Sequence, residues 1–181
     1  MTYYNGRWHL YSEAERKAYG EAQRQAQREK WHAVWISKTG LKDRLWTDKA
    51  ITEFLRPPRD AGPVLAWRRV DVAKVESTAE FKEWMQGRCR TLAKRGVLSE
   101  ALFSVTLTQA QRDLLQSIAA GVSVRRTEEK PEHFRWYKGR KSCTRIARQL
   151  ELSGLITYWG LTRLSGEMRI SPEGLCVLAF T

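Results

Sequence analysis

The order of apolar and polar residues along the chain predicts a mostly helical protein with small β-hairpins. In three segments, residues 78–95, 108–120 and 142–153, apolar residues recur every three or four positions, as on one face of a helix. Each segment begins with a hydroxyl residue that can accept a hydrogen bond from the first helical turn: Thr78, Thr108 and Ser142. Thr108 and Gln111 also have the spacing of a capping box, in which side chain and backbone satisfy each other.

A longer helix is expected near the start of the chain, from Glu13 to about Ile36, after a capping box of Ser12 and Glu15. Its apolar stripe is mostly alanine and buries little area, whereas its far end, from Trp31 onward, is more apolar and is expected to pack on a core. Two interpretations stay open for this helix. It is either a solvated structural element or an arm that contacts phosphate or a second subunit.

Short strands are expected in two regions. Residues 64–70 have the composition of a strand or hairpin arm, with Asp71 as the cap of a short helix that follows. Residues 155–159 and 167–170 form a second expected hairpin, after which Ser171 and Pro172 open the last helix. Residues 122–130 are polar and are expected to form a connecting loop.

The formal net charge of +12 at pH 7 bears on the kind of partner that the protein binds. Such a charge favours binding to a polyanion, which is most often nucleic acid and sometimes a membrane surface. It excludes an acidic protein that imitates nucleic acid. The segment from Arg135 to Arg148 concentrates this charge, because it has six basic side chains and no acidic one.

The three cysteines, Cys89, Cys143 and Cys176, lie far apart and within apolar patterns. Their odd number and wide spacing argue against a disulfide framework and against a metal site, and they predict a reduced, intracellular protein. No apolar run approaches the ~20 residues that span a bilayer. The first residues also lack the apolar segment of a signal peptide. We therefore expect a cytoplasmic protein without a membrane partner.

Motifs for catalysis are weak. Residues 80–82 and 128–130 match the E-x-K fragment of metal-dependent nucleases, but that chemistry needs a further carboxylate on an adjacent strand. The first fragment is expected at a helix start and the second in a polar loop. The three histidines are scattered and have no ligand-spaced partners. We expect no enzymatic activity, no metal and no cofactor.

Residues 41–76 carry the order W-T-x-x-A-I-x-x-F-L, a proline-containing loop, a short strand and V-D-V-x-x-V-E. This order resembles the small winged helix-turn-helix of the MerR and excisionase type. The resemblance implies that a first helix pair sits on DNA and that a strand pair forms a wing, and it makes Arg68 and Arg69 candidate nucleic-acid contacts. Pro57 and Pro58 depart from the pattern, because they occupy the expected start of the second helix.

Residues 106–181 carry L-T-x-x-Q-x-x-L-L-x-x-I-A-x-G, a helix that ends in L-x-x-S-G-L-I-T, a hairpin, and R-I-S-P-E-G. This order is similar to the winged-helix domains of bacterial regulators. Residues 122–141 depart from it, since they are longer and more aromatic than the usual second helix and indicate a strand or loop in its place. Winged helices also serve as protein-interaction modules, so the resemblance bears on fold more than on binding.

Under this resemblance, the helix that begins near Ser142 takes the place of a recognition helix. The residues expected at base edges are Thr144, Arg145, Arg148 and Gln149, and those expected at phosphates are Lys138, Arg140, Lys141 and Arg163. The alternative is a surface helix whose charges are solvated. The aromatic residues near these charges also have two interpretations, which are stacking on unpaired bases and burial in a core.

The sequence therefore predicts three parts: a basic N-terminal helix (1–40), a winged helix-turn-helix-like module with a connector helix (41–97), and a C-terminal winged-helix module (98–181). The expected function is non-catalytic nucleic-acid binding, with duplex DNA favoured over RNA or single strands, in transcription control or in the replication and maintenance of a mobile element. The alternative is a structural subunit of a larger nucleoprotein or protein assembly, in which the modules hold a protein partner or a second copy.

Overall fold

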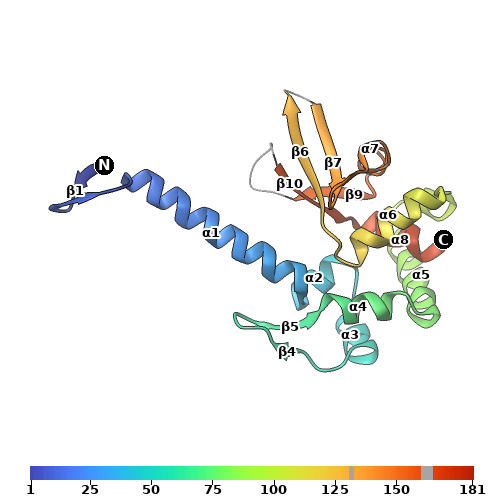
Figure 1. The fold of residues 1–181 in the computed structure, drawn as a ribbon. Coiled ribbons are helices and arrows are strands. Elements are labelled where there is room, and N and C mark those ends of the chain that lie inside the picture. The colour runs from blue at the N-terminus through green and yellow to red at the C-terminus, as the bar shows by residue number, and fades with distance from the viewer. Residues whose placement is uncertain (131–132, 160–164) are drawn as a thin grey trace. The chain divides into compact units, whose positions relative to one another are not determined.

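The computed structural model describes residues 1–130, 133–159 and 165–181 (Figure 1). These residues form helices and small antiparallel sheets, which confirms a mixed helical and β-hairpin fold. The chain divides into two compact units, Met1–Val34 and Trp35–Thr181. The predicted boundaries near residues 40 and 97 stay predictions.

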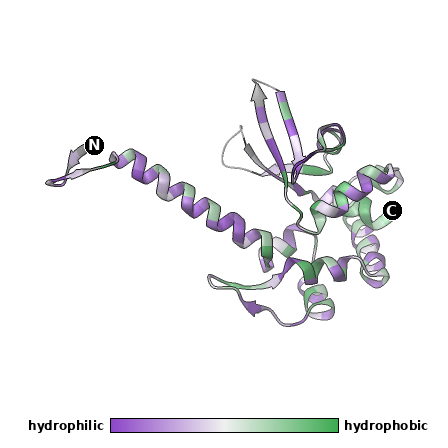
Figure 2. Cartoon of the chain, viewed as in Figure 1, coloured by the Kyte–Doolittle hydropathy of each residue, from purple (hydrophilic) through white to green (hydrophobic). Residues whose placement is uncertain are grey.

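The first unit is a hairpin followed by one helix. Strands β1 (Thr2–Tyr4) and β2 (Arg7–His9) pair antiparallel around Asn5 and Gly6, which both have positive φ, as a tight two-residue hairpin turn requires. Helix α1 (Glu13–Val34) begins with the predicted capping box, because Ser12 N–H donates to Glu15 and Glu15 N–H donates to the Ser12 hydroxyl. The two bonds that the Ser12 N–H and hydroxyl donate to the Glu15 carboxylate lower the pKa of that carboxyl. No residue of α1 is buried, and Figure 2 shows a largely hydrophilic helix.

The predicted helix end at Ile36 is wrong. The chain becomes extended after Val34 and forms β3 (Trp35–Ser37), which pairs with β5 and buries Ile36. The physical reason is a new helix start, since the Ser37 hydroxyl accepts from Gly40 N–H and caps α2 (Lys38–Asp43). An N-cap residue is extended, so a helix through residue 37 is excluded.

The following elements of the second unit are α3 (Asp48–Phe54), β4 (Arg59–Asp60), β5 (Leu65–Arg68), α4 (Arg69–Glu76), α5 (Ala79–Lys94) and the 3-10 turn η1 (Glu100–Ser104). The predicted cap by Thr78 is confirmed, since its hydroxyl accepts from the Phe81 backbone, and Thr47 caps α3 in the same way through Ala50. The predicted cap Asp71 is wrong. Helix α4 begins at Arg69, which leaves Asp71 inside the first turn, where its charge favours the positive helix end.

The last elements are α6 (Gln109–Ala119), β6 (Val124–Lys130), β7 (His133–Lys138), β8 (Lys141–Ser142), α7 (Thr144–Leu152), β9 (Ile156–Trp159), β10 (Ser165–Ile170) and α8 (Pro172–Phe180). The strands form one antiparallel sheet in the order β8-β7-β6-β10-β9. The capping box of Thr108 and Gln111 and the cap by Ser171 before Pro172 are confirmed.

The expected loop at residues 122–130 is instead strand β6 in the middle of that sheet. Only the first residue of this strand, Val124, is apolar and buried. The residues after it are polar or charged, so the alternation of apolar and polar positions that marks a strand is missing. The expectation of a strand or loop within residues 122–141 is confirmed, because the described residues there form β6, β7 and the start of β8.

The predicted start of α7 at Ser142 is also wrong. Ser142 lies in β8 and pairs with Tyr137 of β7. The helix begins at Thr144, and the preceding Cys143 makes no side-chain cap bond. The Thr144 hydroxyl accepts from Trp136 N–H at 3.1 Å, so the first helical residue is fixed to β7. At the other end, Gly154 has a φ of +70° and terminates the helix as predicted.

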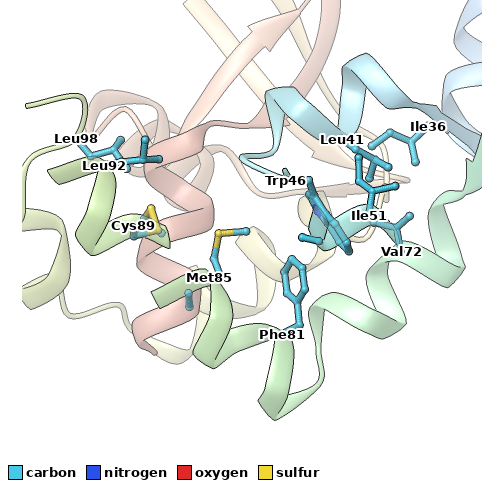
Figure 3. Close-up of a cluster of buried hydrophobic side chains, with 13 residues drawn as sticks. Ile36, Leu41, Trp46, Ile51, Val72, Phe81, Met85, Cys89, Leu92 and Leu98 are labelled. Atoms are coloured by element: carbon cyan, nitrogen blue, oxygen red, sulfur yellow. A yellow bond between two sulfur atoms is a disulfide. The ribbon is translucent and has the colours of Figure 1, made fainter. Parts of the chain in front are cut away.

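The core of the second unit consists of two buried clusters. The first surrounds Trp46, whose ring centroid lies 4.4 Å from that of Phe81, and includes side chains of α2 to α5 (Figure 3). The second joins α6 and α7 to the five-stranded sheet through residues such as Leu115, Trp136 and Leu150. Helix α8 contributes to both clusters, because Cys176 belongs to the first and Val177 to the second.

The cysteine prediction is wrong for two of the three residues. Cys89 of α5 and Cys176 of α8 form a buried disulfide, because packing brings together side chains that lie 87 residues apart. Cys143 is a free, half-buried thiol, and burial raises its pKa. Within the described ranges, no helix is long and apolar enough to cross a membrane.

Reduction of the disulfide is expected to destabilise the second unit. Because the bond closes a long loop, its loss should lower the free energy of unfolding by about 2–5 kcal/mol. Urea unfolding followed by near-ultraviolet circular dichroism, with and without a reductant, measures this difference. Cys143→Ser serves as the matched control and should respond to reductant as the wild type does. Equal midpoints with and without reductant would contradict a bonded Cys89 and Cys176.

Two helical glycines are expected to respond in opposite ways to alanine. A Cβ at Gly174 would collide with the Leu155 carbonyl oxygen and approach Ile170 Cγ1 to 3.0 Å, whereas a Cβ at Gly87 meets nothing within 4 Å. Gly174→Ala should therefore destabilise the fold by about 1–3 kcal/mol. Gly87→Ala should stabilise it by up to about 1 kcal/mol through helix propensity. Thermal unfolding of the two variants tests the pair, and a stabilising Gly174→Ala would refute the close approach of α8 to Leu155.

Candidate nucleic-acid interface

Helix α7 presents the predicted division between an inner and an outer face. Ala147 and Leu150 are buried, whereas Arg145, Arg148 and Gln149 are exposed. The inner face packs on α6, β7 and β9 (Figure 1). This division follows from the helical spacing of the small and apolar residues, and it leaves two guanidinium groups and one amide on the outside.

A cation beneath α7 fixes the helix to the sheet. Arg126 of β6 donates to Glu151 of α7 at 2.8 Å. Its guanidinium carbon also lies 4.4 Å from the ring centroid of Phe134 and 3.9 Å from that of Tyr158. Both side chains of the ion pair are less than one quarter exposed, so the pair is only partly screened by water. Nothing in the sequence pattern singled out Arg126, because the strand that carries it was expected to be a loop.

Thr144 has a local structural role. Its hydroxyl accepts from Trp136 N–H and lies 3.0 Å from the Ser142 hydroxyl. Gln149 also has a partner, since its side-chain oxygen accepts from Gln111 of α6 at 3.3 Å. Of the four residues predicted at base edges, Arg145 and Arg148 are therefore the ones whose side chains project outward without a described side-chain bond.

Three predicted phosphate contacts precede α7 directly. Lys138 ends β7, and its ammonium donates to the Ser117 hydroxyl of α6 at 2.7 Å. Arg140 and Lys141 are exposed at the turn around Gly139, whose φ is +60°. The fourth predicted contact, Arg163, lies outside the described residues.

The chain therefore gathers a basic surface at one end of the second unit, which we name the α7 surface: Lys138, Arg140, Lys141, Arg145, Arg148 and Gln149. The sequence contains no acidic residue between His133 and Leu150. The nearest carboxylate in sequence, Glu151, is engaged by Arg126 on the inner side of the helix. The potential at the α7 surface is consequently positive without local compensation from its own segment.

Arg68 and Arg69 belong to a different region. They occupy the junction of β5 and α4, outside the sheet that carries α7. Arg68 is exposed, and its guanidinium carbon lies 5.9 Å from the ring centroid of Trp35. Arg69 is half-buried and packs so closely on Gly121 that an added Cβ there would lie 3.0 Å from its Cδ.

The environment of Arg69 disfavours its charge. Burial lowers the pKa of Arg69 to about 10, with further lowering by the positive charges of Arg44 and Arg169, while Glu167 and Glu76 act in the opposite direction. Its Nε is buried and has no hydrogen-bond partner among the described residues. Because the folded pKa is lower than the unfolded one, protonated Arg69 opposes folding at neutral pH, and this penalty is relieved as the pH rises through about 10.

The neighbouring Arg44 is the opposite case, a buried cation with a full set of partners. Its guanidinium binds both carboxylate oxygens of Glu76, with Nε to Oε1 at 3.0 Å, and it donates to the Ala119 carbonyl at 3.1 Å. Trp46 Nε1 donates to the same carboxylate at 3.1 Å. This network connects α2, α4 and α6 and has a structural role. Nothing in the sequence pattern marked it.

The described part of the chain holds no group of three His, Cys, Asp or Glu side chains that could bind a metal ion. Glu80 lies in the first turn of α5, as expected. Glu128 lies in strand β6, so its expected place in a loop is wrong.

Comparisons with known proteins give no relative from which a function could be carried over. No protein-family model matches the chain, and neither the curated proteins nor the solved structures contain a match.

Replacement of the two arginines by methionine is expected to separate their roles. Arg44→Met leaves Glu76 buried without its cation, so the free energy of unfolding should fall by about 3–5 kcal/mol. Arg69→Met removes a desolvated charge between two other arginines and should change stability by less than about 1 kcal/mol or increase it. Urea unfolding at pH 7 compares the two variants. Equal destabilisation by both would contradict the difference in their surroundings.

Proposed function

We propose that this protein binds duplex DNA without catalysis, through α7 in the major groove. The observation that carries the proposal is the α7 surface, where two outward arginines continue a basic turn on a helix held by an ion pair and a packed core. A major groove about 12 Å wide admits an α-helix. Arginine can donate two parallel bonds to the O6 and N7 atoms of guanine.

The roles of the α7 residues follow from their positions. Arg145 and Arg148 lie three residues apart on the outer side and are the proposed base contacts, with Gln149 beside them. Lys138, Arg140 and Lys141 are the proposed phosphate contacts, which would give affinity that decreases steeply with salt. Thr144 serves to orient the helix start through its bond with Trp136.

We interpret residues 106–181 as a winged-helix-like module. In this interpretation, α6 is the first helix, α7 the reader, and β9 and β10 the wing, whereas β6 and β7 occupy the place of the second helix. The support is the order of elements and the position of α7 between α6 and the sheet. Transcription control or maintenance of a mobile element would suit a reader of this kind.

A second candidate function is a structural subunit of a nucleoprotein or protein assembly. It is favoured by one observation on the first unit. Helix α1 buries no residue, and large apolar side chains there are exposed: Tyr3, Trp8, Leu10, Tyr11 and Tyr19. Exposed apolar surface of this kind is typical of protein interaction sites.

Alanine variants of the α7 surface test the leading proposal. Arg145→Ala and Arg148→Ala should each weaken binding to a selected duplex by about 1–3 kcal/mol and relax its sequence preference. Lys141→Ala should weaken all sequences alike and reduce the salt slope by about one unit. Fluorescence anisotropy with selected and scrambled duplexes at two salt concentrations makes these measurements.

The matched control is Lys94→Ala, which removes an exposed charge from α5 and should leave duplex affinity within twofold of the wild type. If Arg145→Ala loses the same affinity for selected and scrambled duplexes, Arg145 contacts phosphate and does not read bases. Absence of duplex binding by the wild type at low salt would refute the proposal in favour of the assembly subunit.

A further inference from the structure

The register of the five-stranded sheet sorts its side chains onto two faces. Residues paired across neighbouring strands point to the same side of a sheet. One face carries Val124, Trp136, Met168 and Ile156, which are buried against the helices. The other face, which we name the open face, carries Arg125, Thr127, Arg135, Tyr137, Thr157, Trp159, Glu167 and Arg169.

The open face is most accessible at β6 and β7, whereas Arg169 of β10 is partly covered, since one of its Nη atoms is buried. None of the eight side chains just named is buried, and Arg125, Arg135 and Thr157 are exposed. The helices that pack on this sheet, α6 and α7, belong to the core on the opposite side, with Leu115 and Leu150 in the same cluster as Trp136. The sheet thus has one face in the core, as antiparallel sheets commonly do, while the opposite face is open to solvent at β6 and β7 and lies near Asp43 and Arg69 at β10.

One row of residues crosses the open face from strand to strand. Arg125 pairs with Tyr137 on one side and with Glu167 on the other, and Glu167 pairs with Trp159. Neighbouring strands lie about 4.8 Å apart, so the backbones at Tyr137 and Trp159 are separated by about 14 Å. Two aromatic rings therefore stand at the ends of a row with a guanidinium between them.

Cations surround this row. Arg135 lies on the same face as Tyr137 and two residues before it, and Arg169 extends over Trp159 with its guanidinium carbon 3.6 Å from the ring centroid. Three arginines on this face are opposed by its one described carboxylate, Glu167, and by Asp43, which lies near Arg169. Burial lowers the pKa of Arg169, and the charges of Glu167 and Asp43 oppose that shift. The net charge of the face stays positive.

We infer that the open face binds unpaired nucleotides, DNA or RNA, as a site separate from the α7 surface. Aromatic rings and guanidinium planes on a sheet are suited to stacking on splayed bases, while nearby arginines neutralise the phosphates. A duplex keeps its bases stacked inside and offers no such ring faces. The inference extends the proposed nucleic-acid binding to a second surface, but it requires no contact by α7.

Other classes of ligand fit the open face less well than unpaired nucleotides. A lipid surface would require aliphatic side chains, and the eight described residues of this face include none. An acidic peptide would use the arginines but leave Tyr137 and Trp159 without a role. A peptide strand adds to a sheet at its edge, which is β8 or β9 here, and not over its face.

Variants of the full-length protein separate the two surfaces. Tyr137→Leu removes a ring while it keeps apolar bulk, and Arg125→Ala removes the central cation. Tyr137→Leu should weaken binding to a labelled oligothymidine by between about 5-fold and about 150-fold, the range for loss of one stacked base, and Arg125→Ala should weaken it by at least about 5-fold. Both should leave duplex affinity within twofold. Tyr137→Phe keeps the ring and should retain oligothymidine affinity, which distinguishes stacking from a structural role.

The reverse variants, Arg145→Ala and Arg148→Ala, should weaken duplex binding and leave oligothymidine binding within twofold. Retained thermal unfolding midpoints ensure that each comparison concerns folded protein. The inference is overturned if the wild type does not bind oligothymidine, if Tyr137→Leu binds it as the wild type does, or if poly-glutamate displaces it as effectively as unlabelled oligothymidine. Oligothymidine binding through Tyr137 without any duplex binding would sustain this inference and refute the proposed function of α7.

Discussion

The buried ion pair of Arg44 and Glu76 is the constraint on which the arrangement of the second unit depends. An isolated charge in a protein interior is strongly disfavoured, so each group requires the other at a fixed distance. Arg44 follows α2, Glu76 ends α4, and the Arg44 Nη2 that binds Glu76 also donates to the Ala119 carbonyl in the last turn of α6. Three segments of chain are therefore positioned by one pair of side chains.

This constraint extends to the outer surfaces through α6. Helix α6 packs on α7 and on β10, and it offers Ser117 to Lys138 and Gln111 to Gln149. Arg126 then fixes α7 from below through Glu151 and two aromatic rings. Exposed charges on α7 are thus held in place by charges in the interior, and the orientation of Arg145 and Arg148 depends on residues beneath the helix.

The sequence predicted local features and missed those that depend on distant residues. Caps at Ser12, Thr78 and Thr108 are local, because a hydroxyl and a backbone N–H three residues away suffice. The outer and inner sides of α7 followed from helical spacing alone. Strand β6 was missed because its residues after Val124 are polar, and their partners lie in β7 and β10. The open face was missed with it, since residues can be assigned to one face of a sheet only when the pairing register of its strands is known.

Two further misses have the same origin. The spacing of Cys89 and Cys176 along the chain carries no information on their separation in space, and an odd number of cysteines permits one bond and one free thiol. The role of Arg44 could not be read from the pattern, because only the burial of Trp46 and the approach of α6 enclose it. The sequence pattern identifies the type of each element, whereas tertiary packing determines which residues it contacts.

The absence of buried residues in α1 has a thermodynamic consequence. Most helical stability in proteins comes from tertiary packing, and a helix without it melts over a broad temperature range, one turn at a time from its ends. In the second unit α8 contributes to both buried clusters, so a single cooperative unfolding transition is expected there. The helical signal of the chain is therefore a sum of a gradual and a sharp transition, and a single melting temperature describes only the second.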